Sequence, residues 1–199
     1  MTMMRRHWLV GSGALAVGVA CGCGDRAPEP TSTASAQRSG GLEPIVWTVP
    51  PTWPMSESSP SKARRAGYKV PPAGNDKEDA ELLVLFFGTG ANGDRDKQWE
   101  PWFEQFDGTP KESATRAEFD APAGRVETFE FKGAYKLNLV QQRPGMKKSP
   151  VQMVKQDFRM IGAVVKTTSR GNWFFRLVGP DETVLAAKDA FLSMLSGVR

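Results

Sequence analysis

Apolar and polar residues follow one another along the chain in patterns that predict six strands and two helices between residues 45 and 197. A continuous apolar run over 81–87 predicts a central strand buried on both faces. Alternation over 124–138 predicts a strand that bulges or bends at Gly133. The other strands are expected where β-branched and aromatic residues gather between turn residues, at 45–49, 63–70, 158–165 and 172–178.

One helix is predicted over 96–106, because four large aromatic residues recur there at helical spacing. They are Trp99, Trp102, Phe103 and Phe106. Asp94 or Asp96 is expected to cap the start of this helix. Pro101 either kinks the helix or marks a first turn that begins near Glu100.

A second helix is predicted to begin at Asp181, where an acidic group suits the positive helix end, and to end at Gly197. Its buried stripe consists of Val184, Ala187, Phe191 and Leu195. The polar segment 167–171 predicts a hairpin between the last two strands. This order of elements is typical of an α+β fold in which helices pack on an antiparallel β-sheet.

The N-terminus carries a basic start, a short apolar stretch and small residues that lead into a cysteine. The apolar stretch over 8–20 has about 13 residues, whereas a membrane-spanning helix needs about 20. We therefore expect a bacterial export signal. Gly18-Val19-Ala20-Cys21 resembles a lipobox, which predicts cleavage after Ala20 and lipid attachment at Cys21, with Cys23 as the alternative. Plain secretion after cleavage near Ala20 is a second interpretation.

The signal also indicates the export pathway and the membrane in which the lipid anchor is expected. Arg5-Arg6-His7-Trp8-Leu9 resembles a twin-arginine signal, and the general secretory route stays open as well. Acyl chains such as palmitate on Cys21 supply the two or more buried chains that stable anchoring requires. Because Gly22 is not an acidic retention residue, we expect the outer membrane, facing the periplasm, ahead of the inner membrane.

Composition divides the rest of the chain into two parts. Residues 21–41 contain almost no large apolar side chain, so they read as a flexible tether after the signal peptide of residues 1–20. Residues 42–199 are expected to form a single domain.

Charge and residue content exclude several classes of function. Removal of Arg5 and Arg6 with the signal leaves 24 basic and 22 acidic residues, a net charge of +2, which gives no case for nucleic-acid binding. His7, the sole histidine, is removed with the signal, and no cysteine follows Cys23. The mature domain therefore lacks the residues of a catalytic triad, a Cys-His dyad or an imidazole metal site. We expect no catalytic residue, metal or cofactor.

The charges are unevenly spread along the sequence. Residues 76–130 hold 14 acidic and 6 basic groups, whereas residues 132–176 hold 10 basic groups and one acid. In an antiparallel sheet these two halves are expected to interleave and largely neutralise each other. The alternative is a basic patch around Arg143, Lys147, Lys148 and Lys155 that faces anionic lipid or an acidic partner.

Several motifs together resemble a group of uncharacterised bacterial exported proteins, whose domain is similar to the PsbP-like α/β/α sandwich. The resemblance spans most of residues 45–196. It implies a fold used for binding and assembly and no shared reaction. The matching segments are Trp47–Trp53, Ala66–Pro71, Leu85–Gly90, Trp102–Phe106, Arg159–Ala163 and Trp173–Pro180.

Three functions remain in view. The leading one is a non-enzymatic, lipid-anchored envelope protein whose domain binds another envelope component. The second is a small-ligand or glycan-binding module that uses a cleft between sheet and helix or uses Trp53, the candidate contact because Pro51 and Pro54 bracket it. The third is a hydrolase that uses carboxylates alone.

Gly88-Thr89-Gly90 lacks the further residues of a phosphate loop and is interpreted as a turn. Residues 92–96 suit helix capping better than a calcium loop.

Overall fold

The computed structural model describes residues 44–57, 61–108, 110–141 and 149–199, and of 138–141 and 149–151 the backbone alone. Contacts divide the chain into residues 1–31 and 32–199, and every described residue lies in the second unit. This unit holds a six-stranded antiparallel sheet with helices, which confirms the predicted α+β class.

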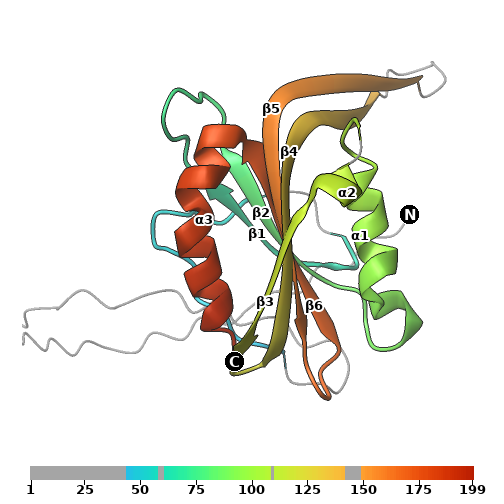
Figure 1. Ribbon diagram of the computed structural model, residues 1–199, viewed down its shortest axis with the longest axis vertical. Helices are drawn as coiled ribbons and strands as arrows, with labels where there is room; N and C mark the ends of the chain where they lie inside the picture. The colour runs from blue at the N-terminus through green and yellow to red at the C-terminus, as the bar shows by residue number, and fades with distance from the viewer. Residues whose placement is uncertain (1–43, 58–60, 109, 142–148) are drawn as a thin grey trace, which may run out of the picture. The chain divides into compact units, whose positions relative to one another are not determined.

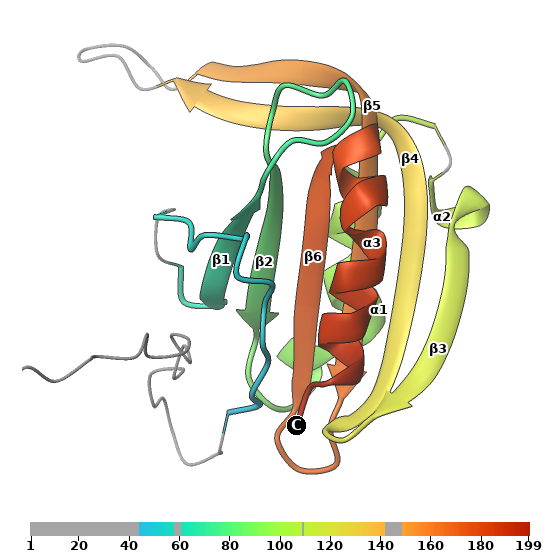
Figure 2. The same cartoon turned by 90° about the vertical axis from the view of Figure 1, so that its left-hand side faces the viewer.

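The strands lie in the order β1-β2-β6-β5-β4-β3, and all neighbours are antiparallel. Strands β3 to β6 follow one another in the sheet, and β6 returns to pair with β2 (Figure 2). Segments far apart in the sequence therefore meet at the centre of the sheet. The bounds are β1 (Arg64–Val70), β2 (Ala80–Phe86), β3 (Thr115–Ala121), β4 (Gly124–Gln141), β5 (Ser149–Lys166) and β6 (Asn172–Pro180).

Helix α3 (Asp181–Ser196) covers one face of the sheet, as Figure 1 shows. Its predicted stripe is buried against the sheet, and Gly197 ends it as predicted. At its start, Asp76 accepts hydrogen bonds from the backbone N–H and the hydroxyl of Thr183, at 2.7 and 2.8 Å. This carboxylate caps the helix from the β1–β2 loop, because Pro180 has no capping side chain.

An extended segment over 44–53 packs on the same face as α3. Ile45, Trp47 and Trp53 are buried in the cluster that α3 makes with the sheet. The N–H of Val46 donates to the carbonyl of Arg199 at 2.7 Å, and the N–H of Arg199 donates back at 3.1 Å. The prediction of a strand over 45–49 is therefore wrong, because this segment pairs with the end of the chain and not with a sheet strand.

Helix α1 (Arg95–Phe103) covers the opposite face (Figure 1). The Asp94 carboxylate accepts from the N–H of Lys97 at 3.0 Å, which confirms the predicted cap. All four predicted aromatic residues are buried there against rings from the sheet. Pro101 lies inside the helix, which ends at Phe103, and Phe106 joins the cluster from beyond that end. The short helices η1 (Ala91–Gly93) and α2 (Pro110–Ser113) flank α1.

Strands β2 and β3 differ from the sequence-based expectation. The run over 81–87 lies next to the edge strand β1, and its α1-side residues Leu83 and Leu85 are only half-buried. It is therefore not buried on both faces as predicted. Strand β3 was not predicted, because it is an edge strand whose residues are mostly exposed and include the charged Arg116, Glu118 and Asp120. Such side chains protect an edge against unwanted pairing.

Candidate functional site

The predicted processing site lies outside the described residues, and so do Ala20, Cys21 and the alternative Cys23. The export signal and lipid anchor therefore stay predictions from the sequence. In the part of the chain that the structure describes, no helix is long and apolar enough to cross a membrane.

The tryptophans of the domain lie in its interior. Trp47, Trp99, Trp102 and Trp173 are between 2 and 9% exposed, which confirms the interpretation that these four are core residues. Trp53 is 7% exposed and packs in the cluster beneath α3. The backbone N–H of Trp53 donates to the carbonyl of Pro50 at 3.0 Å in a turn. The candidate contact Trp53 therefore offers little indole surface to a ligand.

One of these indoles has a polar partner in the core. Nε1 of Trp47 donates to the hydroxyl of Tyr68 at 3.1 Å. Burial raises the pKa of Tyr68, and the hydrogen bond from Trp47 offsets only part of this effect. The tyrosine is thus held neutral as a structural group.

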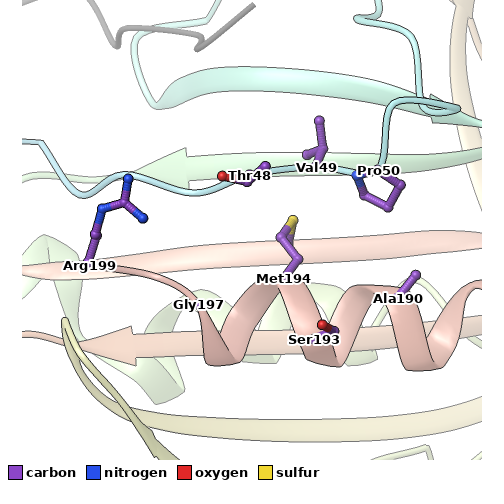
Figure 3. Close-up of a pocket in the computed structure, with 8 residues that line it drawn as sticks. All are labelled: Thr48, Val49, Pro50, Ala190, Ser193, Met194, Gly197 and Arg199. Carbon is purple, nitrogen blue, oxygen red and sulfur yellow. The ribbon is translucent and has the colours of Figure 1, made fainter. Parts of the chain in front are cut away.

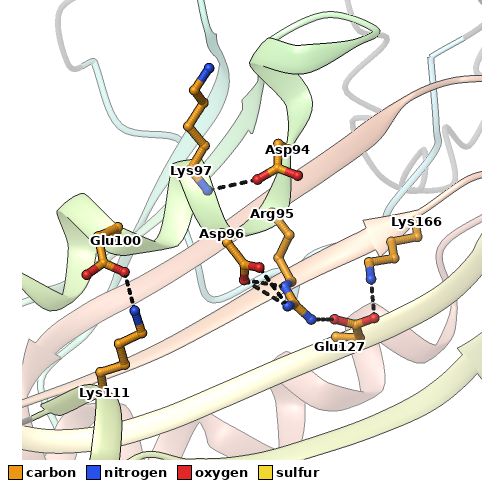
Figure 4. Close-up of polar contacts among 8 residues, drawn as sticks. All are labelled: Asp94, Arg95, Asp96, Lys97, Glu100, Lys111, Glu127 and Lys166. Atoms are coloured by element: carbon orange, nitrogen blue, oxygen red, sulfur yellow. Dashed lines mark hydrogen bonds and ion pairs between the residues drawn. The ribbon is translucent and has the colours of Figure 1, made fainter.

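Cations of the basic half pair with carboxylates of the acidic half across the sheet, which agrees with the prediction that the two halves interleave. Arg143, Lys147 and Lys148 of the alternative basic patch lie outside the described residues. On the α1 side, Glu127 accepts from Arg95 at 2.6 Å and from Lys166 (Figure 4). Burial alone raises the pKa of Glu127, but these two donors outweigh it and hold the pKa below its ordinary value. Glu127 is therefore ionised at neutral pH and unsuited to act as a general acid.

A second network joins β4, β5 and the start of α3. Asp181 accepts from Lys132 at 2.8 Å and from Arg159 at 2.6 Å. Glu130 accepts from Arg159 and from Lys188, the latter at 2.6 Å. Asp181 and Glu130 thus each face two cations. The described residues contain no group of three or more side chains suited to hold a metal.

A groove lies between the extended segment and the C-terminal half of α3 (Figure 3). It has a volume of about 430 Å³, and the Met194 side chain points toward Thr48 and Val49 across it. Its polar groups are the hydroxyls of Thr48 and Ser193 and the guanidinium of Arg199. No acid–base pair or nucleophile with a base stands among them, so the groove offers no catalytic arrangement.

A second open cleft of about 430 Å³ lies where β1 begins and β2 ends. Phe86, Phe87 and Gly88 line it, and the Phe86 ring packs with the α3-side cluster whereas the Phe87 ring packs with the α1-side cluster. The guanidinium of Arg65 lies 5.4 Å from the centre of the Phe86 ring. We name this the cationic cleft; its lining residues are Lys62, Ala63, Arg65, Phe86, Phe87, Gly88, Asn92 and Gln98.

Sequence reasoning missed Lys62 and Arg65 as candidate site residues, because they lie more than twenty positions before the turn that they face. The one available signal was Gly88-Thr89-Gly90, which lies after β2, bends at Thr89 and Gly90 and has a φ of 91° at both glycines. A turn motif alone does not reveal which side chains another strand will place beside it.

The most distinctive surface is a two-stranded arm. Strand β5 leaves β6 after the pair Phe158↔Pro180. Beyond that point Tyr135–Gln141 of β4 pairs with Ser149–Lys155 of β5, and Tyr135 also forms a bridge with Phe106. The predicted bulge occurs between Gly133 and Tyr135, and Asp157 opposite it has a φ of 53°. Figures 1 and 2 show the arm bending away from the sheet at one end.

The base of the arm is fixed by contacts with the domain. Lys136 donates its N–H to the carbonyl of Gln105 at 2.7 Å, and Nζ of Lys155 donates to Glu78 at 2.5 Å. The ring of Tyr135 stacks on Phe158 at 5.6 Å. Farther out, Met153 and Val154 are each 43% exposed. The arm is thus held firmly at its base and presents apolar side chains to solvent farther out.

No protein-family model matches the chain, and the comparison with curated proteins finds no similar sequence.

Proposed function

We propose that this protein is a lipid-anchored, non-enzymatic module of the bacterial cell envelope that binds another envelope protein. The export signal and Cys21 support the anchor, with the outer membrane, facing the periplasm, as the proposed location. Helices on both faces of an antiparallel sheet support a PsbP-like α/β/α sandwich.

The arm is the observation that carries this proposal. A hairpin of two strands is marginally stable by itself in water, and this arm extends beyond the last pair that joins it to β6. Open strand edges accept extended segments of other chains, because unpaired N–H and C=O groups find partners there. The exposed Met153 and Val154 would add apolar contacts to such a pairing.

The proposed partner is therefore a protein that adds an extended segment along the outer edge of β5. Main-chain hydrogen bonds would supply affinity, and pockets for alternate side chains would supply specificity. This mode of binding needs no titratable group. It agrees with Glu127, whose negative charge is balanced by Arg95 and Lys166, and with a sequence in which His7 is the only histidine.

Site-specific photocrosslinking in living cells tests the proposal. A benzophenone amino acid at Met153 or Val154 should give a defined crosslinked band with one envelope protein. The same probe at Leu185, which is 51% exposed on α3, should give none. Mass spectrometry of the mature N-terminus checks the anchor, with a lipid-modified Cys21 as the expected result.

Met153→Lys and Leu185→Lys form the matched pair for function. Both place a charge at an exposed apolar position and should leave the free energy of unfolding within about 0.5 kcal/mol of wild type. Only Met153→Lys should abolish recovery of the partner. Equal crosslinking at 153 and 185, or equal recovery by the two variants, would contradict a binding role of the arm.

A further inference from the structure

The two edges of the sheet differ in what covers them. The outer edge of β1 is used by the chain itself, because the N–H of Lys69 donates to the carbonyl of Pro54 at 2.9 Å and the N–H of Ser56 donates to the carbonyl of Gly67 at 2.8 Å. In the described part of the chain, no segment pairs in this way with the outer edge of β3, which Figure 2 shows at the other side of the sheet. The edge at β3 is therefore the one that can still accept a strand.

The pairing of β3 with β4 indicates which backbone groups of β3 face outward. The pair Ala121↔Gly124 closes a two-residue turn, so it is a hydrogen-bonded pair, and such pairs recur at every second residue. Ala117 belongs to this set, and its carbonyl also accepts from Oγ1 of Thr128 in β4 at 3.2 Å. The N–H and C=O groups that point away from β4 are therefore those of Arg116, Glu118 and Asp120.

These three outward residues carry charges that change from positive to negative along the strand. The guanidinium of Arg116 lies 5.8 Å from the centre of the Phe103 ring and makes no ion pair with the described residues. Glu118 and Asp120 follow, and they share one cation, Arg125, at 2.6 and 3.1 Å. The edge thus presents an unpaired cation first and a surplus of negative charge after it.

We infer that β3 pairs with β3 of a second copy of this chain, antiparallel and about a two-fold axis at Ala117. An antiparallel copy reverses the order of the charges, so Arg116 of each chain lies opposite Glu118 of the other. Ala117 meets Ala117 on the axis in a non-hydrogen-bonded pair, where the Cα atoms are closest and small side chains fit. An axis at Glu118 would instead set two like charges opposite each other, which destabilises a strand pair.

The charges of β3 also explain why this edge is selective. Charged side chains on an edge strand discourage pairing with apolar strands and with strands of like charge. A second copy has the complementary pattern by symmetry, and one contact then forms two Arg116–Glu118 pairs. Backbone hydrogen bonds supply the affinity, and the ion pairs determine the partner and the register.

This inference is independent of the arm. Strand β3 pairs with residues 124–130 of β4, whereas the arm begins at Tyr135. An envelope protein on the arm and a second copy on β3 therefore use different edges, and failure of either proposal leaves the other standing.

A cysteine on the proposed axis tests the geometry. The full chain is produced without export and with Cys21→Ser and Cys23→Ser, so that it carries neither lipid nor another thiol. Ala117→Cys should then form a disulfide-linked dimer under mild oxidation, because residues opposite each other in a non-hydrogen-bonded pair have Cα atoms about 4.5 Å apart.

Thr115→Cys is the control for this crosslink, since it is also exposed on β3. Its two copies would lie four residues apart along the paired strands, roughly 13 Å, which is beyond the reach of a disulfide. A non-reducing gel should therefore show the dimer for Ala117→Cys alone. Equal crosslinking of the two variants, or none for Ala117→Cys, would contradict the axis.

Charge variants test the complementarity by sedimentation equilibrium of the same full chain. Arg116→Glu and Glu118→Arg each bring like charges together and should weaken the dimer at least about ten-fold. A mixture of the two variants should form a heterodimer, because the glutamates of one chain then meet the arginines of the other. This recovery also shows that both variants are folded.

Lys69→Glu makes the same charge change as Arg116→Glu on β1, at the opposite edge of the sheet. It should leave the dimerisation constant within about two-fold of wild type, because exposed charges at that separation are screened. A wild-type chain that stays monomeric up to about 1 mM, a mixture without heterodimer, or equal effects of Lys69→Glu and Arg116→Glu would each overturn the inference.

Discussion

Gly162 occupies a position in β5 where the sheet leaves no room for a side chain. A Cβ atom at this residue would lie 2.2 Å from the ring of Phe129. Phe129 is fully buried, and the rings of Trp99 and Phe103 each lie 4.7 Å from it. Because these rings fix one another, Phe129 cannot move aside to accept a methyl group.

Gly162→Ala should therefore lower the free energy of unfolding by about 1–3 kcal/mol, the usual cost of overpacking a core. Urea denaturation followed by tryptophan fluorescence measures the change. Gly197→Ala is the control, because the nearest atoms to its Cβ are carbonyl oxygens at 3.7 Å. Similar unfolding midpoints for the two variants would show that Phe129 is less constrained than the contacts indicate.

At the scale of elements, the carboxylate of Asp181 joins the start of α3 to Lys132 of β4 and Arg159 of β5. Burial raises the pKa of Asp181, but hydrogen bonds from Lys132 and Arg159 outweigh it and leave the pKa below the ordinary value of 3.8. The folded protein therefore binds this proton less readily than the unfolded chain does. The stabilisation is complete above about pH 5 and is lost progressively as the pH falls through the ordinary pKa and then the lowered pKa of the folded state.

Asp181→Asn should accordingly destabilise the protein by about 1.5–3 kcal/mol at pH 7, since charge-assisted hydrogen bonds are removed. The difference from wild type should shrink as the pH is lowered from 5 toward 3, at about the point where the carboxyl group protonates. Urea titrations at several pH values measure it. Asp189→Asn, at an exposed position of the same helix, should show neither effect. A difference that does not vary with pH would argue against an ionised Asp181.

The pattern of apolar residues along the sequence is sufficient to predict those helices that bury one face against the sheet. The aromatic residues of α1 and the stripe of α3 were read correctly, because burial imposes the helical period on both. Strand β3 was missed because an edge strand meets solvent and carries charges instead. The segment 45–49 has the residues of a strand, yet its partner is the end of the chain, which no local pattern indicates.

The candidate surfaces were harder to foresee than the elements. The sequence predicts a strand only from residue 158, whereas β5 begins at Ser149, so the arm is not foreseen although the bulge at Gly133 is predicted. The cationic cleft brings together Lys62 before β1, Gly88 after β2 and Gln98 of α1. Only the pairing of β1 with β2 and the placement of α1 bring such residues together.

At the scale of the whole molecule, the two ends of the domain close one face of the core together. Ile45 is 1% exposed and Trp47 is 9% exposed, and both pack in the cluster beneath α3. The backbone bonds between Val46 and Arg199 hold them there. The N-terminal segment thus belongs to the fold although it forms no strand of the sheet.

Truncation should reveal this dependence as a sharp boundary. A chain that begins at residue 42 should unfold at the same urea concentration as the full chain. A chain that begins at residue 51 loses Ile45 and Trp47, and its free energy of unfolding should fall by about 3–6 kcal/mol, because fully burying each large apolar side chain contributes about 1.5–3 kcal/mol. Circular dichroism and urea denaturation measure both. The control is Arg199→Ala, whose backbone bonds to Val46 survive. If the chain from residue 51 were as stable as the chain from residue 42, the core would not need its N-terminal segment.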